Sequence, residues 1–232
     1  MAAKPKTSTP EQTPAPSPAR ATRSTDGLDL MEWVQVNSRL LGGAAAVIAV
    51  AAAGYWFYIR SQQIKTINAD RSLMQAEQSL QSGNTALASS DLQRVVTRYK
   101  GTGAGTQAAL LLAQTDYNAG KYQDGIKVLQ EVSGHSGGGE ATVQGLIGDG
   151  YSQMGKLSEA AKAYEKAASA TIYENEKAYY RAKAARSFSS AGNIADARRL
   201  WTELSTDHKS QSVAAEARVR LAELDAKRAG KS

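Results

Sequence analysis

A glycine recurs at nearly constant spacing through the C-terminal two thirds of this 232-residue chain. The four copies are separated by 37, 35 and 37 residues and stand at Gly83, Gly120, Gly155 and Gly192. After each one, a small or apolar residue follows two positions later, Ala or Gly five positions later, and a large apolar residue nine positions later. A period of this length is typical of stacked helix pairs, because one pair alone leaves an apolar face uncovered.

The distribution of proline indicates that these repeats are helical. All five prolines lie within the first 18 residues, and the rest of the chain contains none. Proline removes an amide donor and clashes with the preceding helical turn, so a long proline-free stretch rich in Ala, Leu, Gln, Glu and Lys can be helical throughout. Aromatic residues make up only 6% of the chain, and β-branched runs are rare, which argues against a sheet-based core. We therefore expect an all-α protein.

The third copy of the repeat shows the pattern most clearly. Its defining residues are Gly148, Tyr151, Gly155, Ala160 and Tyr164. We expect Gly155 in the turn between the two helices, where only glycine adopts the left-handed conformation cheaply. The two small residues at 148 and 160 let the helices approach closely, and the two tyrosines fill the space around that contact. The corresponding residues of the other copies include Gly83, Gly120, Gly192, Ala197 and Trp201.

This pattern resembles the tetratricopeptide repeat. The resemblance covers about residues 65–227 and implies an α-solenoid of about four helix pairs plus a capping helix. The cap is expected over residues 212–227, where Val213, Ala217, Leu221 and Leu224 fall on one side of a helix. The proline that usually ends the second helix of this repeat is missing from all four copies. We expect the repeat domain to span residues 60–228, followed by a short tail, 229–232.

One segment is apolar enough to cross a membrane. Residues 40–59 contain no charge and are bracketed by Arg39 and Arg60. Twenty helical residues span about 30 Å, the thickness of the hydrocarbon core of a bilayer. Trp56 and neighbouring tyrosines suit the membrane interface, and the Gly- and Ala-rich composition would let a second membrane helix approach. The pattern predicts a single transmembrane helix; a cleaved signal peptide and a buried soluble helix are the alternatives.

Two segments precede the predicted span. Residues 1–27 are rich in Pro, Ser and Thr with few large apolar groups, which is typical of a disordered leader. Residues 28–39 alternate apolar and polar side chains around Trp33, which suggests an amphipathic segment in the membrane interface. Basic residues occur on both sides of the span, so charge alone barely decides its orientation.

The whole layout is similar to the ancillary subunit family of the bacterial Sec translocon. The resemblance rests on a leader, an amphipathic segment with Trp33, one span and four repeats. It implies a single-pass protein of the bacterial inner membrane, with its N-terminus in the cytoplasm and its repeats in the periplasm. It further implies chaperone-like handling of newly translocated, unfolded clients and contact with translocon subunits and envelope-assembly factors.

The sequence offers no catalytic or metal-binding pattern. The absence of cysteine excludes a thiolate zinc site, an iron–sulfur cluster and a cysteine nucleophile. One of the two histidines, His135, lies in a glycine-rich stretch, 133–139, that we interpret as a flexible linker. Neither this stretch nor a second glycine-rich one, 101–105, continues into the Gly-Lys-Ser/Thr of a phosphate loop, and the carboxylates Asp116, Asp149 and Glu159 fall on different predicted helices. We expect no cofactor and no enzymatic activity.

The remaining candidate for function is a protein-binding surface. The net charge of +6 is spread over mixed-sign pairs rather than a basic stripe, so we expect no nucleic-acid partner. In stacked repeats the first helices line a concave groove that suits peptide segments. By repeat position, the groove candidates are Leu73, Glu77, Tyr117, Asp149, Tyr179 and Arg186. The Lys, Asn and Arg set with which some tetratricopeptide proteins clamp a terminal carboxylate is missing.

These features predict a membrane-anchored protein-binding scaffold. Residues 40–59 would contact lipid, and the repeats would contact other proteins, either translocon subunits or unfolded clients. The alternative is an accessory structural subunit of another membrane protein complex, in which the span and the repeats bridge subunits.

Overall fold

The computed structural model describes residue 31, residues 33–207 and residues 209–229. Within these ranges the chain is helical and forms no strand, as the proline-free sequence predicts. The predicted disordered leader, the start of the amphipathic segment and residues 230–232 of the tail lie outside the described residues. The chain divides into two compact units, residues 1–57 and residues 58–232.

In the first unit, the apolar segment forms the beginning of helix α2 (Ser38–Gln81). An 18-residue window of α2 has a mean hydropathy of 1.8, and none of that window is buried by other described residues. The helix is thus long and apolar enough to cross a membrane, and the alternative of a buried core helix gains no support from this part of the chain. Membrane insertion itself stays a prediction. The helix does not end where the charges begin, because it continues through Arg60 to Gln81.

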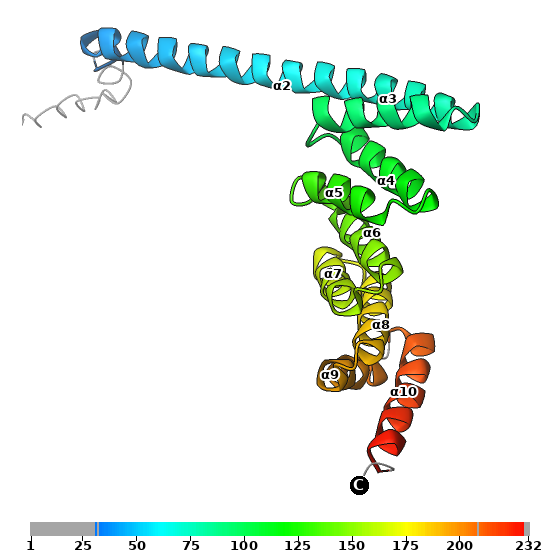
Figure 1. Cartoon of the computed structure of the whole chain (residues 1–232). Helices are drawn as coiled ribbons and strands as arrows, with labels where there is room; N and C mark the ends of the chain where they lie inside the picture. The colour runs from blue at the N-terminus through cyan, green and yellow to red at the C-terminus, as the bar shows by residue number, and fades with distance from the viewer. Residues whose placement is uncertain (1–30, 32, 208, 230–232) are drawn as a thin grey trace, which may run out of the picture. The chain divides into compact units, whose positions relative to one another are not determined.

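The second unit is a row of helix pairs (Figure 1), in which each helix from α3 to α10 packs against its neighbours in the chain. The elements that follow α2 are α3 (Thr85–Arg98), α4 (Gly103–Asn118), α5 (Tyr122–Val132), the 3₁₀ turn η1 (Gly137–Gly139), α6 (Glu140–Gln153), α7 (Leu157–Ala170), α8 (Glu174–Ser190), α9 (Ile194–Ser205) and α10 (Gln211–Ala229). The C-terminal part of α2 shares a core with α3, and the two form the first pair. The pairs α4–α5, α6–α7 and α8–α9 correspond to the second, third and fourth copies of the sequence repeat.

The four repeated glycines occupy the turns within these pairs. Gly83, Gly120, Gly155 and Gly192 have φ angles of 78°, 74°, 71° and 81°, in the left-handed region that glycine adopts without steric cost. In the third turn the amide of Lys156 donates to the carbonyl of Tyr151 at 2.9 Å, which satisfies a carbonyl that the helix end leaves free. The spacing of the glycines therefore sets the lengths of the helices.

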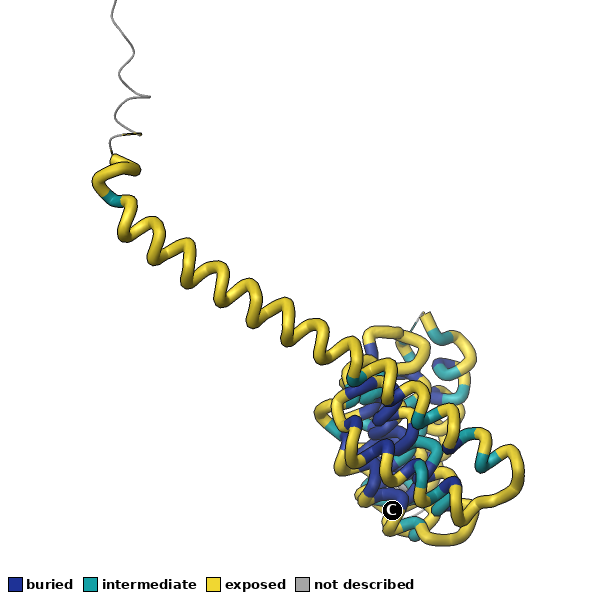
Figure 2. The backbone as a smooth tube through the Cα atoms, turned by 90° about the horizontal axis from the view of Figure 1, so that it is seen from above, coloured by how far each residue is buried: buried dark blue, intermediate teal, exposed yellow. Residues whose placement is uncertain are grey.

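Small side chains dominate the core of the second unit. Ala160, Ala197 and Trp201 are fully buried, and Figure 2 shows buried residues along the inside of the stack. The small alanine side chains allow the helices to approach closely, and a few large side chains such as Trp201 fill the remaining space. The capping helix α10 is slightly longer than predicted; its Ala217 and Leu224 are buried against the last pair.

The glycine-rich segment before α6 is held by one carboxylate. Ser133 Oγ and the amide of Gly134 each donate to Glu140 at 2.8 Å, and Ser136 and Gln144 donate to the same carboxylate. Partial burial acts to raise the pKa of Glu140, but these hydrogen bonds outweigh it and lower the pKa below its usual value. The sequence suggested a flexible linker at 133–139, whereas in the structure three of its first four residues, Ser133, Gly134 and Ser136, are hydrogen-bonded to the first residue of α6.

Candidate protein-binding groove

Three glycines of α6 provide room for tyrosine rings from three other helices. A Cβ atom on Gly145 would lie 2.6 Å from Cε1 of Tyr180, and one on Gly148 would lie 2.5 Å from Cε1 of Tyr164. A Cβ on Gly150 would likewise collide with the hydroxyl of Tyr117. The rings come from α8, α7 and α4. Helix α6 is thus the element against which the second, third and fourth repeats position their tyrosines.

Two of these tyrosines direct their hydroxyl groups to fixed acceptors. Tyr117 donates to the carbonyl of Leu146 at 3.0 Å, and Tyr164 donates to Oδ1 of Asp149 at 2.6 Å. Burial is the main cause that raises the pKa of both phenols, and the negative charge of Asp149 raises it further. Both hydroxyls therefore stay protonated at neutral pH and remain hydrogen-bond donors.

Lys183 of α8 completes a cluster around Asp149. Its Nζ lies 2.5 Å from Oδ1 of Asp149, 4.7 Å from the ring centroid of Tyr164 and 5.4 Å from that of Tyr179. An ammonium group within about 6 Å of an aromatic face is attracted to it. The lysine is thus held by one carboxylate and two rings while its side chain stays 22% exposed. We call Asp149, Tyr164, Tyr179 and Lys183 the Lys183 cluster.

A pocket of about 440 Å³ opens beside this cluster. Polar and aromatic side chains and one leucine, from five helices, form its wall. They are Gln114, Tyr117, Asn118, Tyr122, Leu146, Asp149, Ser152, Gln153, Tyr164 and Lys183. Carboxamides, a hydroxyl and a paired lysine offer both donors and acceptors, which suits the backbone of a peptide segment. Within the ranges that the structure describes, no group of three or more His, Asp or Glu could hold a metal ion.

Three of the predicted groove residues meet in this region. Asp149 and Tyr179 belong to the Lys183 cluster, and Tyr117 lines the adjoining pocket. Tyr179 is 51% exposed and packs edge to face on Tyr180 at a centroid distance of 5.3 Å. The exposed ring therefore has a fixed orientation at the edge of the cluster.

The other three candidates lie elsewhere. Arg186 forms a two-point ion pair with Glu216 of the capping helix, with Nε 2.8 Å from Oε1. Leu73 packs against the core of the first repeats, and Glu77 lies half-buried on α2. The structure thus gives Arg186 a structural contact and does not join the two α2 residues to the Lys183 cluster.

Sequence reasoning missed four residues that shape this site: Gly145, Gly150, Tyr180 and Lys183. Three glycines within six residues lower the intrinsic stability of a helix. Their presence in one predicted helix could therefore have indicated that other side chains pack closely against it. Lys183 follows Asp149 by 34 residues, three fewer than the 37 residues between Gly155 and Gly192. It therefore lies nearly one helical turn before Arg186, the position equivalent to Asp149, and the repeat spacing alone does not pair the two residues.

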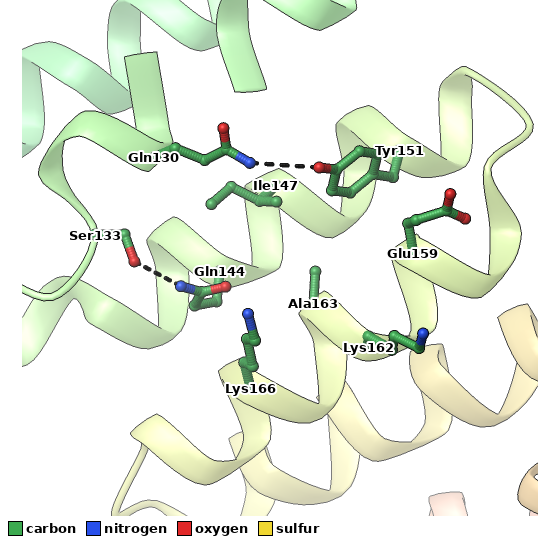
Figure 3. A pocket seen from close by; sticks show the side chains of 9 residues that line it. All are labelled: Gln130, Ser133, Gln144, Ile147, Tyr151, Glu159, Lys162, Ala163 and Lys166. Carbon is green, nitrogen blue, oxygen red and sulfur yellow. Dashed lines mark hydrogen bonds between the residues drawn. The ribbon is translucent and has the colours of Figure 1, made fainter. Parts of the chain in front are cut away.

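A second pocket, of about 320 Å³, lies between α5, α6 and α7 (Figure 3). It is lined by Gln130, Ser133, Gln144, Ile147, Tyr151, Glu159, Lys162, Ala163 and Lys166. Gln130 donates to the hydroxyl of Tyr151 at 3.3 Å, and Gln144 donates to Ser133 at 2.7 Å. Ser133 and Gln144 of this pocket already form hydrogen bonds with each other and with Glu140. This pocket is therefore a weaker candidate for ligand binding than the one beside Lys183.

Comparison with known proteins supports the repeat assignment. The sequence model of a family described as a tetratricopeptide repeat-like domain matches residues 31–142. A crystal structure of nearly identical TPR-like repeats from a kinesin light chain-type protein of Podosopora anserina superposes with a TM-score of 0.51. It is 15% identical and covers 69% of this chain and 88% of that chain; a single-substitution variant of the same protein gives the same values. The chain is thus similar to tetratricopeptide-type repeats, in sequence over residues 31–142 and in fold over a larger part of the chain.

The comparisons concern the fold and the general role of such repeats in binding other proteins. Tetratricopeptide-type repeats serve as protein-binding scaffolds rather than as enzymes, which agrees with the predicted function class. At 15% identity, the solved structures show only a shared fold. No curated protein matches the sequence. The wider resemblance to the ancillary Sec translocon family gains no support from these matches.

Proposed function

We propose that this chain is a membrane-anchored scaffold that binds a segment of another protein in the pocket beside the Lys183 cluster. The observation that carries this proposal is the position of the pocket: it is formed by α4, α6 and α8, the first helices of three successive tetratricopeptide-type repeats, with α5 and α7 at its sides. Such helices line the surface on which a solenoid accepts extended or helical segments.

The chemistry of the pocket suits a peptide backbone with an aromatic or acidic side chain. The side chains of Gln114, Asn118 and Gln153 can donate to and accept from peptide groups. Tyr179 offers an exposed ring whose orientation is fixed by Tyr180. Lys183 already has a carboxylate partner, so an acidic residue of the client would have to share its ammonium with Asp149.

The apolar start of α2 supports the membrane part of the proposal. Its length and hydropathy suit a single span, and no described residue buries it. The layout of leader, span and repeats further supports a bacterial inner-membrane protein with a cytoplasmic N-terminus and periplasmic repeats. In that setting the partners are translocon subunits, envelope-assembly factors or unfolded clients, and the protein acts as an ancillary, chaperone-like subunit.

Co-purification from detergent-solubilised membranes tests the function. We expect the native chain to recover translocon subunits or unfolded clients, and Lys183→Met to recover several-fold less. Lys162→Met, in the second pocket, is the matched control, because it removes one lysine from the same domain without touching the cluster. Equal recovery by Lys183→Met and the native chain would reject the pocket. Stoichiometric recovery of an unrelated complex would favour the alternative, an accessory structural subunit.

Protease treatment of intact spheroplasts tests the orientation. Repeats that face the periplasm will be digested under these conditions, whereas cytoplasmic repeats will be protected until the membrane is lysed. Protection would reject the proposed placement without affecting the binding pocket.

A further inference from the structure

The part of α2 that belongs to the second unit buries one side and exposes apolar side chains on another. Ala69 and Ala76 are fully buried in the core of the first repeats. Ile64, Ile67 and Met74 are 47%, 57% and 68% exposed. Successive helical residues are rotated by 100°, so these three lie on roughly the opposite side of the helix from the two alanines. The helix therefore has a second apolar face that its own domain leaves uncovered.

The exposed face has the spacing of a coiled-coil seam. Its residues follow one another at intervals of four, three, four, three and four: Arg60, Ile64, Ile67, Arg71, Met74 and Gln78. In heptad terms Ile64 and Arg71 occupy a positions, and Ile67 and Met74 occupy d positions. Ala69 and Ala76 then occupy f, the position farthest from the seam. An a/d seam is the surface that one helix presents to a parallel or antiparallel partner helix.

We propose that this seam, residues 60–78 of α2, binds the same seam of a second copy of the chain in a parallel dimer. Charge complementarity selects this partner. In a parallel pair, the residue at a packs beside the g residue of the other helix. Arg71 at a would thus meet Asp70 at g of the second copy, and the symmetry of the pair makes this contact twice. Neither residue forms an ion pair elsewhere in the described part of its own chain.

Two further features are compatible with the parallel arrangement. Arg60, the first charged residue after the apolar segment, occupies a d position. The aliphatic part of its side chain can pack in the seam while the guanidinium group extends to solvent. In the sequence of the first unit, the same three–four spacing continues backward onto Phe57, Ala53, Val50, Ala46 and Gly43. Small residues at such places allow close helix contact in lipid. This last point depends on the proposed membrane anchor, whereas the seam itself does not.

The seam is short, so we expect the stability of the dimer to depend on the membrane anchor. Three exposed apolar side chains per chain bury less surface than a stable soluble dimer needs. Two chains anchored in one bilayer are confined to parallel orientation and to a thin layer, which raises their effective concentration. We therefore expect dimers in membranes and weaker association after dilution in detergent.

The absence of cysteine allows a direct test by disulfide scanning. Single-cysteine variants of the full chain at Ile64, Ile67 and Met74 probe the seam. Variants at Gln62 and Thr66, two exposed residues at f and c, are the matched controls. The chain is oxidised in isolated membranes with copper phenanthroline and separated without reductant. Because a disulfide requires Cβ atoms about 4 Å apart, a parallel dimer predicts roughly fivefold more cross-linked dimer for the seam variants than for the controls.

Three results would overturn the proposal. Equal cross-linking at seam and control positions would indicate random collision. A complete lack of dimer at Ile67 and Met74 would exclude parallel pairing. Cross-links from these positions to a different protein would identify another occupant. Far-UV circular dichroism of each variant checks that the helices are intact. If the chain proves soluble without detergent, the membrane proposal fails, and the same scan in buffer still tests the seam.

Discussion

Substitution of Gly148 by alanine tests whether the close contact between α6 and α7 organises the binding region. Alanine at an open helical position would stabilise the helix by about 1 kcal/mol relative to glycine. Here its Cβ would lie 2.5 Å and 2.6 Å from two ring carbons of Tyr164. That ring is nearly fully buried, and its hydroxyl is held by Asp149, so it cannot turn away without losing a hydrogen bond.

Two unfavourable contributions and one favourable contribution set the expected change in the free energy of unfolding. Overpacking of a filled core costs about 1–3 kcal/mol. Weakening the hydrogen bond from Tyr164 to Asp149 costs about 1 kcal/mol more, since its acceptor is only partly buried. After the helix gain of about 1 kcal/mol, we expect Gly148→Ala to lower the free energy of unfolding by about 2 kcal/mol. For a domain of this size, that corresponds to a fall in Tm of roughly 4–8 °C.

Urea denaturation followed by far-UV circular dichroism measures this difference. Gly103→Ala is the matched control, because Gly103 lies in helix α4 of the same unit but has no atom within 4 Å of the added Cβ. In a Tyr164→Leu background the ring is absent, and Gly148→Ala should then cost little or stabilise. A stability equal to or above that of the native chain for the single variant, or the same loss in both backgrounds, would refute the steric explanation.

Three further substitutions have definite expected outcomes. Gly155→Ala should lower the free energy of unfolding by about 1 kcal/mol, through backbone strain at a φ of 71° rather than through a clash; an unchanged urea midpoint would contradict this. Tyr164→Phe should cost about 1 kcal/mol, because it removes the hydrogen bond from this hydroxyl to Oδ1 of Asp149, which then keeps only Lys183 as its partner; calorimetric unfolding measures the loss. Glu140→Gln should cost about 1 kcal/mol near neutral pH, since one acceptor becomes a donor. The pKa of Glu140 is lowered, so its contribution is complete above the ordinary value of 4.5 and is lost as pH falls below it; the Tm difference between this variant and the native chain should shrink there.

Local features of the repeat were predictable from the sequence, because they depend on a few residues close together. The turns at Gly120 and Gly155 follow from glycine's conformational freedom, and the fully buried Ala160 follows from its place about one turn into the second helix. The capping helix was recognisable because its apolar residues share one side. In each case a short pattern and one physical rule suffice.

The arrangement of the binding region was not predictable to the same extent, because it depends on contacts between repeats. Lys183 meets Asp149 only when α8 packs on α6 in one register, and that register depends on Tyr180 entering the space above Gly145. Glu140 likewise gains its hydrogen-bond partners only when the loop before α6 folds back onto it. Such contacts join residues that are distant in the chain or concealed in a loop.

The continuity of α2 was also outside the sequence prediction. The change in composition at Arg60 suggested a boundary between a span and a domain, yet the helix continues to Gln81. Charged residues do not end a helix; a glycine turn does, and the first one is Gly83. The exposed seam of Ile64, Ile67 and Met74 becomes apparent only once this continuity and the buried alanines are known.

Photo-cross-linking from the Lys183 cluster shows whether this surface contacts a partner protein in intact membranes. A photoreactive phenylalanine analogue at Tyr179, which is 51% exposed, is activated in intact membranes, and the same analogue at Tyr173, 62% exposed in the turn before α8, is the control. The proposed function predicts discrete cross-linked partners from position 179, with little product from position 173 and a several-fold loss when Lys183→Met is added. Identical products from both positions, or products that survive the loss of Lys183 unchanged, would contradict it.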